Sequence, residues 1–90
     1  MIEMEFTFDP AKNRRNFQAH GIDLADVEGV LYDPAAMTVE DGDHEEQRFV
    51  TLGMDATGRL LVLCYTYRGD AIRAISARKA EPHERRAYEE

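Results

Sequence analysis

The fold is decided by two consecutive stretches, Leu60-Leu-Val-Leu-Cys-Tyr-Thr-Tyr67 and Ile72-Arg-Ala-Ile-Ser-Ala-Arg78, which the short turn Arg68-Gly-Asp70 connects. The first stretch is apolar at nearly every position, which is typical of a central strand covered on both faces. The second alternates apolar and polar side chains, which is typical of a half-buried strand. Together they predict two neighbouring strands of an antiparallel sheet.

More strands are predicted toward the N-terminus. Residues 47–52 form a strand that the hairpin loop 55–58 connects to Leu60. Residues 37–40 form a short strand before it, and residues 3–8 alternate polar and apolar side chains as a half-buried strand does.

Three helices are predicted around these strands. The first spans 11–20, because Asp9 suits the N-cap, Pro10 suits the first helical position and Gly21 suits the left-handed C-cap. The second spans 23–33, with an apolar stripe at helical spacing, and the third spans 82–88. The order β-α-α-β-β-β-β-α predicts one small α+β domain over 1–90, with an antiparallel sheet, two N-terminal helices and one C-terminal helix.

Charge is distributed unevenly along this acidic chain of 90 residues, whose formal net charge is −7. Residues 1–58 contain 13 acidic and 4 basic residues, a net charge of −9, whereas residues 59–90 contain 5 acidic and 7 basic residues, a net charge of +2. The acidic total argues against a general nucleic-acid-binding protein, so an anion site has to be built locally. The asymmetry fits a protein with two different partners.

Several classes of protein are disfavoured by simple features. The lone Cys64 cannot form an intrachain disulfide, and its apolar neighbours predict a buried thiol instead of a nucleophile. No apolar run has the length of a membrane span, and the first residues do not resemble a signal peptide, so a cytoplasmic location is expected. The acidic run 41–46 lacks the spacing of a calcium loop, and we expect neither a metal site nor a cofactor.

An ordered set of motifs resembles the BrnT family of type II toxins along almost the whole chain. These motifs are Phe8-Asp9-Pro10, Lys12, Asn16, His20-Gly21-Ile22, Glu46-x-Arg48, Leu61-x-Leu63-x-Tyr65-Thr66, Arg73-x-Ile75-Ser76-Ala77-Arg78-Lys79-Ala80 and Glu84-Arg85-x-x-Tyr88. The resemblance implies a RelE-like fold and a ribonuclease that arrests translation. It also implies a hetero-oligomer with BrnA, a ribbon-helix-helix antitoxin that neutralises the toxin. The antitoxin contacts operator DNA, and the toxin is connected to that DNA only through the antitoxin.

Cleavage of RNA without a metal needs a base, an acid and cations that hold the charge of the pentavalent phosphate. The cation candidates are Arg48, Arg73 and Arg78, each on a predicted strand. Arg78 is ranked first because it lies in the densest family motif. The alternative is that each arginine pairs with a nearby carboxylate, such as Glu46 or Glu84.

For proton transfer, the resemblance to the BrnT family places His20 first, and Glu46 near Arg48 is the second candidate. The alternatives are that His20 caps its helix and that Glu46 forms an exposed ion pair.

Contacts with RNA are assigned to Lys12, Asn16, Lys79 and Tyr88. For Lys12 and Asn16 the alternative is that they fix the first helix to the sheet. A rival function is a non-catalytic binding module that acts as a co-repressor with its DNA-binding antitoxin.

Overall fold

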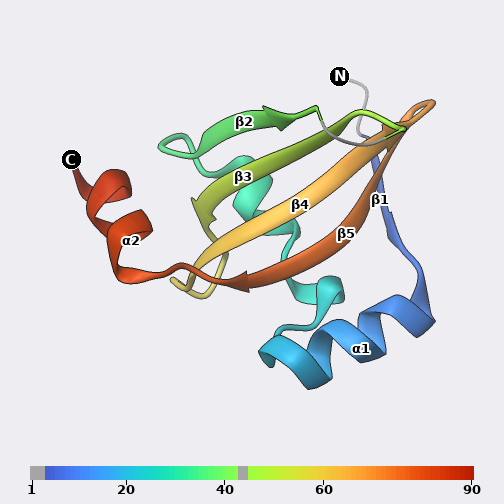
Figure 1. The fold of residues 1–90 in the computed structure, drawn as a ribbon, viewed down its shortest axis with the longest axis horizontal. Coiled ribbons are helices and arrows are strands. Elements are labelled where there is room, and N and C mark those ends of the chain that lie inside the picture. The colour runs from blue at the N-terminus through green and yellow to red at the C-terminus, as the bar shows by residue number, and fades with distance from the viewer. Residues whose placement is uncertain (1–3, 43–44) are drawn as a thin grey trace.

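A five-stranded sheet runs through the middle of the molecule (Figure 1). The computed structural model describes residues 4–42 and 45–90. The strands are β1 (Glu5–Phe8), β2 (Met37–Asp41), β3 (Arg48–Met54), β4 (Leu60–Arg68) and β5 (Ala71–Lys79). Their spatial order is β1-β5-β4-β3-β2, so β4 is central, as its apolar sequence predicts.

The sheet is mixed, and in this respect the prediction of an antiparallel sheet needs correction. Strands β2 to β5 pair in antiparallel fashion through successive neighbours. Strand β1 instead pairs in parallel with β5, from Glu5 opposite Ala71 to Phe8 opposite Ala74. No hairpin turn joins these two strands, so the chain connection does not force them to be antiparallel.

Helix α1 (Pro10–His20) begins and ends as predicted. The Asp9 side chain accepts a hydrogen bond from the Lys12 N–H, and Gly21 has a left-handed φ of 70°. The C-terminal helix α2 (Pro82–Glu89) begins with a capping box between Glu81 and Glu84. No helix in the described part of the chain is long and apolar enough to span a lipid bilayer.

The predicted second helix is two short 3-10 helices, η1 (Leu24–Asp26) and η2 (Glu28–Tyr32). Val27 ends the first and begins the second. Gly29 packs so closely on the 55–58 hairpin that a Cβ atom there would lie 2.8 Å from the Ala56 nitrogen. This close approach, together with the poor helix propensity of glycine and valine, favours two tight turns over one continuous α-helix.

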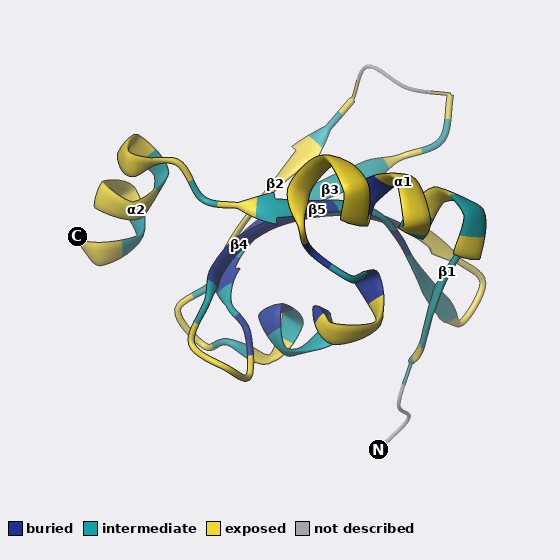
Figure 2. Ribbon diagram, turned by 90° about the horizontal axis from the view of Figure 1, so that it is seen from below, coloured by how far each residue is buried: buried dark blue, intermediate teal, exposed yellow. Residues whose placement is uncertain are grey.

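The hydrophobic core lies between the sheet and these short helices. Leu24, Val27 and Val30 are fully buried against the side chains of Leu61 and Leu63. In Figure 1, η2 lies behind β3 and β4 and η1 lies between β5 and α1, and Figure 2 shows the sheet bending around them. Each fully buried aliphatic side chain contributes about 1.5–3 kcal/mol, so this layer supplies much of the stability.

The other face of the sheet is turned toward the viewer in Figure 1, and we call it the open face. Side chains alternate along a strand, so Val62, Cys64 and Thr66 of β4 lie on the open face when Leu61 and Leu63 face the core. No helix or second sheet in the described part of the chain packs on this face of β4, so the predicted cover on both faces comes here from neighbouring side chains. Val62 and Thr66 are nevertheless buried by neighbouring side chains, whereas Cys64 is only half-buried.

Candidate functional site

Arginines gather at one end of the open face. Directly paired residues of neighbouring strands point to the same side of a sheet. Thr66 of β4 pairs with Arg48 of β3 on one side and with Arg73 of β5 on the other. The two arginines thus flank Thr66, with Cα atoms about 10 Å apart, two strand spacings. Arg68, two residues along β4, shares this face, and we call Arg48, Arg68 and Arg73 the arginine cluster.

Two acidic residues lie near the arginine cluster in the described part of the chain: Asp41 of β2 is the cross-strand neighbour of Arg48, and Glu46 pairs with Arg68. Arg73 forms no ion pair there, and the Nε atom of Arg48 is buried without a hydrogen-bond partner. Arg68 Nη2 lies 3.3 Å from Glu46 Oε2, and both side chains are exposed. Such a pair is worth about 0–1 kcal/mol, so a stronger anion can replace it. The cluster therefore has the charge and the unused donors to bind a phosphate.

Arg68 is the member that the sequence analysis missed, because it was assigned only to the turn after β4. The structure extends β4 through Arg68, which pairs with Ala71 at the start of β5. The predicted strand ended at Tyr67. If it had been extended by one residue, the alternation of side chains along β4 would have placed Arg68 on the same face as Thr66.

Cys64 lies in the next row of the open face, between Ser76 of β5 and Val50 of β3. Burial raises the pKa of the Cys64 thiol, while the charge of Arg48 partly opposes this rise and that of Asp41 adds to it. A neutral thiol is a poor nucleophile, so Cys64 is a neighbour of the arginine cluster and not a reacting group.

Arg78 lies at the other end of the open face. It pairs with Val62, which is four residues from Thr66 along β4, or about 13 Å. Its two terminal nitrogens donate to the two oxygens of Glu84 at 2.8 and 2.9 Å. Hydrogen bonding to Arg78 is the main cause that lowers the pKa of Glu84, to about 2, and the same bond raises the pKa of Arg78. The ion pair that was the alternative for Arg78 is therefore present.

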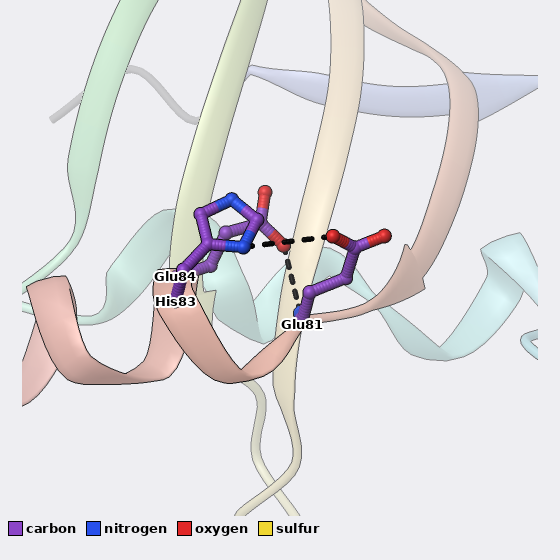
Figure 3. A group of neighbouring side chains, drawn as sticks. All are labelled: Glu81, His83 and Glu84. Atoms are coloured by element: carbon purple, nitrogen blue, oxygen red, sulfur yellow. Dashed lines mark hydrogen bonds and ion pairs between the residues drawn. The ribbon is translucent and has the colours of Figure 1, made fainter.

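Glu84 has a second role at the start of α2. Its Oε1 atom also accepts from the Glu81 N–H at 2.8 Å. Figure 3 shows Glu81, His83 and Glu84 together in the first turn of α2, with donor atoms close enough to suggest a metal site. Glu84 is already bound to a guanidinium and to a backbone N–H, however, and Glu81 and His83 are exposed. This arrangement suits a helix cap better than a metal site.

Asn16 makes the contacts that the alternative in the sequence analysis describes, between the first helix and the sheet. It is only 6 % exposed. Its Nδ2 donates to the carbonyl oxygens of Ile22 (2.9 Å) and Ala77 (3.0 Å), and its Oδ1 accepts from the Ala77 N–H (3.1 Å). The amide thereby fixes α1 to β5, and both of its N–H donors, the groups that an RNA phosphate would need, are already used. Lys12, one turn earlier, is exposed.

The remaining candidates lie apart from the arginine cluster. His20 is exposed in the last turn of α1, where the Gly21 N–H caps the helix by donating to Phe17 O at 2.8 Å. Lys79 is exposed and lines a hollow of about 250 Å³ together with Arg59 and Arg85. These three residues make the hollow basic, although Arg59 is also bound to a buried aspartate.

Tyr88 also has a structural contact. Its hydroxyl donates to Asp33 Oδ2 at 2.6 Å, which fixes α2 beside η2. That bond is the main cause that lowers the pKa of Asp33 and raises the pKa of Tyr88. The structure thus brings Glu46, Arg48 and Arg73 to one end of the open face and leaves Tyr88 near its other end, with Arg78.

Comparison with known proteins identifies the family to which the chain belongs. Residues 8–84 match the family model described as the ribonuclease toxin, BrnT, of a type II toxin-antitoxin system. The chain belongs to the BrnT family. It is accordingly a ribonuclease toxin whose partner is an antitoxin.

Among solved structures, the toxin is similar to the 1.1 Å crystal structure of the Brucella abortus ribonuclease toxin BrnT. The TM-score is 0.72 at 24 % sequence identity, over 88 % of this chain and 99 % of that one. At this identity the likeness establishes the α+β fold with its mixed sheet. No curated protein matches the chain.

Proposed function

We propose that the toxin cleaves RNA without a metal ion, with the scissile phosphate bound at the arginine cluster of the open face. The observation that carries this proposal is the pairing of Thr66 with both Arg48 and Arg73, which places two guanidiniums on one rigid surface. Guanidinium donors fixed on strands stabilise charge that develops on a phosphate, because they need no reorganisation during the reaction. The weakly held Arg68 adds a third donor group.

The proposed reaction is an internal transesterification. The 2′-oxygen of the ribose forms a bond to phosphorus while the bond from phosphorus to the 5′-oxygen breaks. The proton of the 2′-hydroxyl passes to a base, and an acid gives a proton to the leaving 5′-oxygen. The products are a 2′,3′-cyclic phosphate and a 5′-hydroxyl. Metal ligands are not needed, because the cluster supplies the positive charge.

Glu46 is the proposed base, because its carboxylate already lies beside Arg68 at this end of the sheet. A phosphate that takes over Arg68 would release this carboxylate next to the reacting group. His20 is proposed as an alternative proton donor or acceptor for an RNA strand that crosses the sheet toward α1.

Arg78 is proposed to bind a second phosphate of the same strand. The Arg78 side chain is 38 % exposed, and its fork holds the two oxygens of Glu84, which supports its use by a similar pair of phosphate oxygens. A phosphate presents the same geometry and replaces the carboxylate. Lys12, Lys79 and Tyr88 are proposed to lie along the path of the RNA backbone, outside the reacting group.

The setting proposed for this activity is the cytoplasm, where RNA cleavage arrests translation. A BrnA-like ribbon-helix-helix antitoxin is proposed to neutralise the toxin and to connect it to operator DNA. The acidic N-terminal part of the chain supports a partner with a basic docking segment.

The test is cleavage of RNA by the purified toxin and by Arg48→Ala and Arg73→Ala variants, in buffer with EDTA. Loss of one such donor is expected to slow cleavage about a hundredfold or more, with little change in melting temperature. Arg86→Ala is the control, because Arg86 is an exposed arginine on α2. Cleavage that stops in EDTA, or variants as active as the control, would contradict the proposal. A folded toxin that cleaves no RNA would favour a co-repressor.

A further inference from the structure

The two edges of the sheet differ in how they are protected. At one edge β5 is covered first by β1, which pairs with residues 71–74. Beyond β1, the Asn16 amide binds both the N–H and the C=O of Ala77, as a neighbouring strand would. These contacts satisfy the backbone of Ala77 and pair β5 with β1, which is the last strand at this edge and is only four residues long.

At the other edge, no strand in the described part of the chain lies beyond β2. Strand β2 is the last in the sheet order, and four of its five residues are exposed. In an antiparallel pair, alternate residues direct their N–H and C=O groups away from the partner strand, here away from β3. Strand β2 contains neither proline nor lysine, which edge strands commonly use to discourage further pairing, and its only charged residues are the acidic Glu40 and Asp41.

Apolar side chains accompany this edge. Met37 is 47 % exposed and Val39 is 65 % exposed, and both lie on the open face because they pair with Leu52 and Val50. A strand added beside β2 would bury both side chains against its own alternate residues. Exposed backbone donors and an apolar stripe together are the features that extended peptides recognise when they add to a sheet.

Charge indicates what kind of segment fits. From residue 16 to residue 47 the sequence contains nine aspartates and glutamates and no lysine or arginine. Strand β2 lies within this stretch and itself ends with Glu40 and Asp41. The field around the edge is therefore negative, so it attracts a cationic segment and repels an acidic one.

We propose that an extended, basic segment of the antitoxin binds this toxin by adding a strand to β2. This proposal rests on the proposed neutralisation of the toxin by an antitoxin, and it adds the edge of the sheet at which that antitoxin binds. A strand added to β2 would lie two strand spacings, about 10 Å, from β3, which carries Arg48, so long side chains of the same segment can reach toward the arginine cluster. An antitoxin segment that binds to β2 would therefore also cover the arginine cluster.

The direct test is amide hydrogen exchange of the toxin, alone and with the antitoxin encoded beside it, purified separately. Outward N–H groups within residues 37–41 are expected to exchange at least about tenfold more slowly in the complex, since they gain hydrogen-bond acceptors. A complex that forms without slower exchange at β2 would overturn the edge proposal and leave the toxin–antitoxin pairing intact. An antitoxin that does not bind at all would overturn both.

A matched pair of variants tests the same edge by affinity. Val39→Lys places a positive charge and a long side chain on β2, whereas Phe17→Lys makes a similar change at the 55 % exposed Phe17 of α1. Val39→Lys is expected to weaken antitoxin binding at least about tenfold, and Phe17→Lys by less than about threefold. Val39→Thr, which keeps a β-branched side chain, is expected to bind within about threefold of the parent. Equal losses for both lysine variants would overturn the proposal.

Discussion

Replacing Asn16 by alanine is expected to destabilise the toxin strongly, because one side chain joins α1, Ile22 of the loop after it, and β5. The substitution removes three hydrogen bonds, two from Nδ2 and one to Oδ1. Each is worth about 0.5–1.5 kcal/mol net, so the free energy of unfolding should fall by roughly 2–4 kcal/mol. For a domain of this size that corresponds to a melting temperature lower by about 10–25 °C.

Urea unfolding followed by circular dichroism measures this change, with two further variants as comparisons. Asn16→Asp should be worse than alanine at neutral pH, because a carboxylate would face the carbonyl oxygens of Ile22 and Ala77 without a proton to donate. Gln18→Ala changes an exposed residue of the same helix and should alter stability by less than about 0.5 kcal/mol. A loss below about 1 kcal/mol for Asn16→Ala would refute the view that this amide closes the sheet edge.

Two other predictions concern ionisable groups. The pKa of Glu84 is about 2 in the folded toxin, below its ordinary value of 4.5, so its carboxylate stabilises the fold above pH 4.5 and loses this effect as the pH falls toward 2. Urea titrations at pH 5 and pH 3 should therefore show a smaller loss of stability for Glu84→Gln than for the parent, and equal losses would argue against the Arg78 ion pair. The raised pKa and half-buried position of Cys64 predict that a thiol reagent at pH 8 labels the native toxin at least about tenfold more slowly than the unfolded chain. Equal labelling rates would show that β4 is not packed as described.

Local sequence signals predicted most elements of the fold, since their causes lie within a few residues. The Asp9-Pro10 start and Gly21 end of α1 follow from capping chemistry, and the apolar run of β4 predicts its central place. The parallel direction of β1 was missed because it depends on the distant strand β5. The division of the second helix was missed because the close approach of Gly29 to the 55–58 hairpin is a tertiary contact.

Side-chain partners were harder to predict than elements. Sequence reasoning named the alternatives for Arg78 and Asn16, but only the fold shows that Glu84 reaches back six residues to Arg78 and that Asn16 reaches Ala77. The grouping of Arg48 with Arg73 depends on strand register, which a single β-bulge near Cys64 and Tyr65 shifts. One misplaced residue in a strand reverses the face of every side chain beyond it, so this site could not be assembled from the sequence alone.

The most direct test of the central claim is to identify the ends that the purified toxin leaves on a defined RNA. Internal transesterification at an arginine cluster predicts a 2′,3′-cyclic phosphate, or the 3′-phosphate formed from it, together with a 5′-hydroxyl, and cleavage that persists in EDTA. It also predicts that a single 2′-deoxy substitution on the 5′ side of the cut bond abolishes cleavage there. A 5′-phosphate product, or cleavage next to the deoxy nucleotide at the normal rate, would contradict the mechanism.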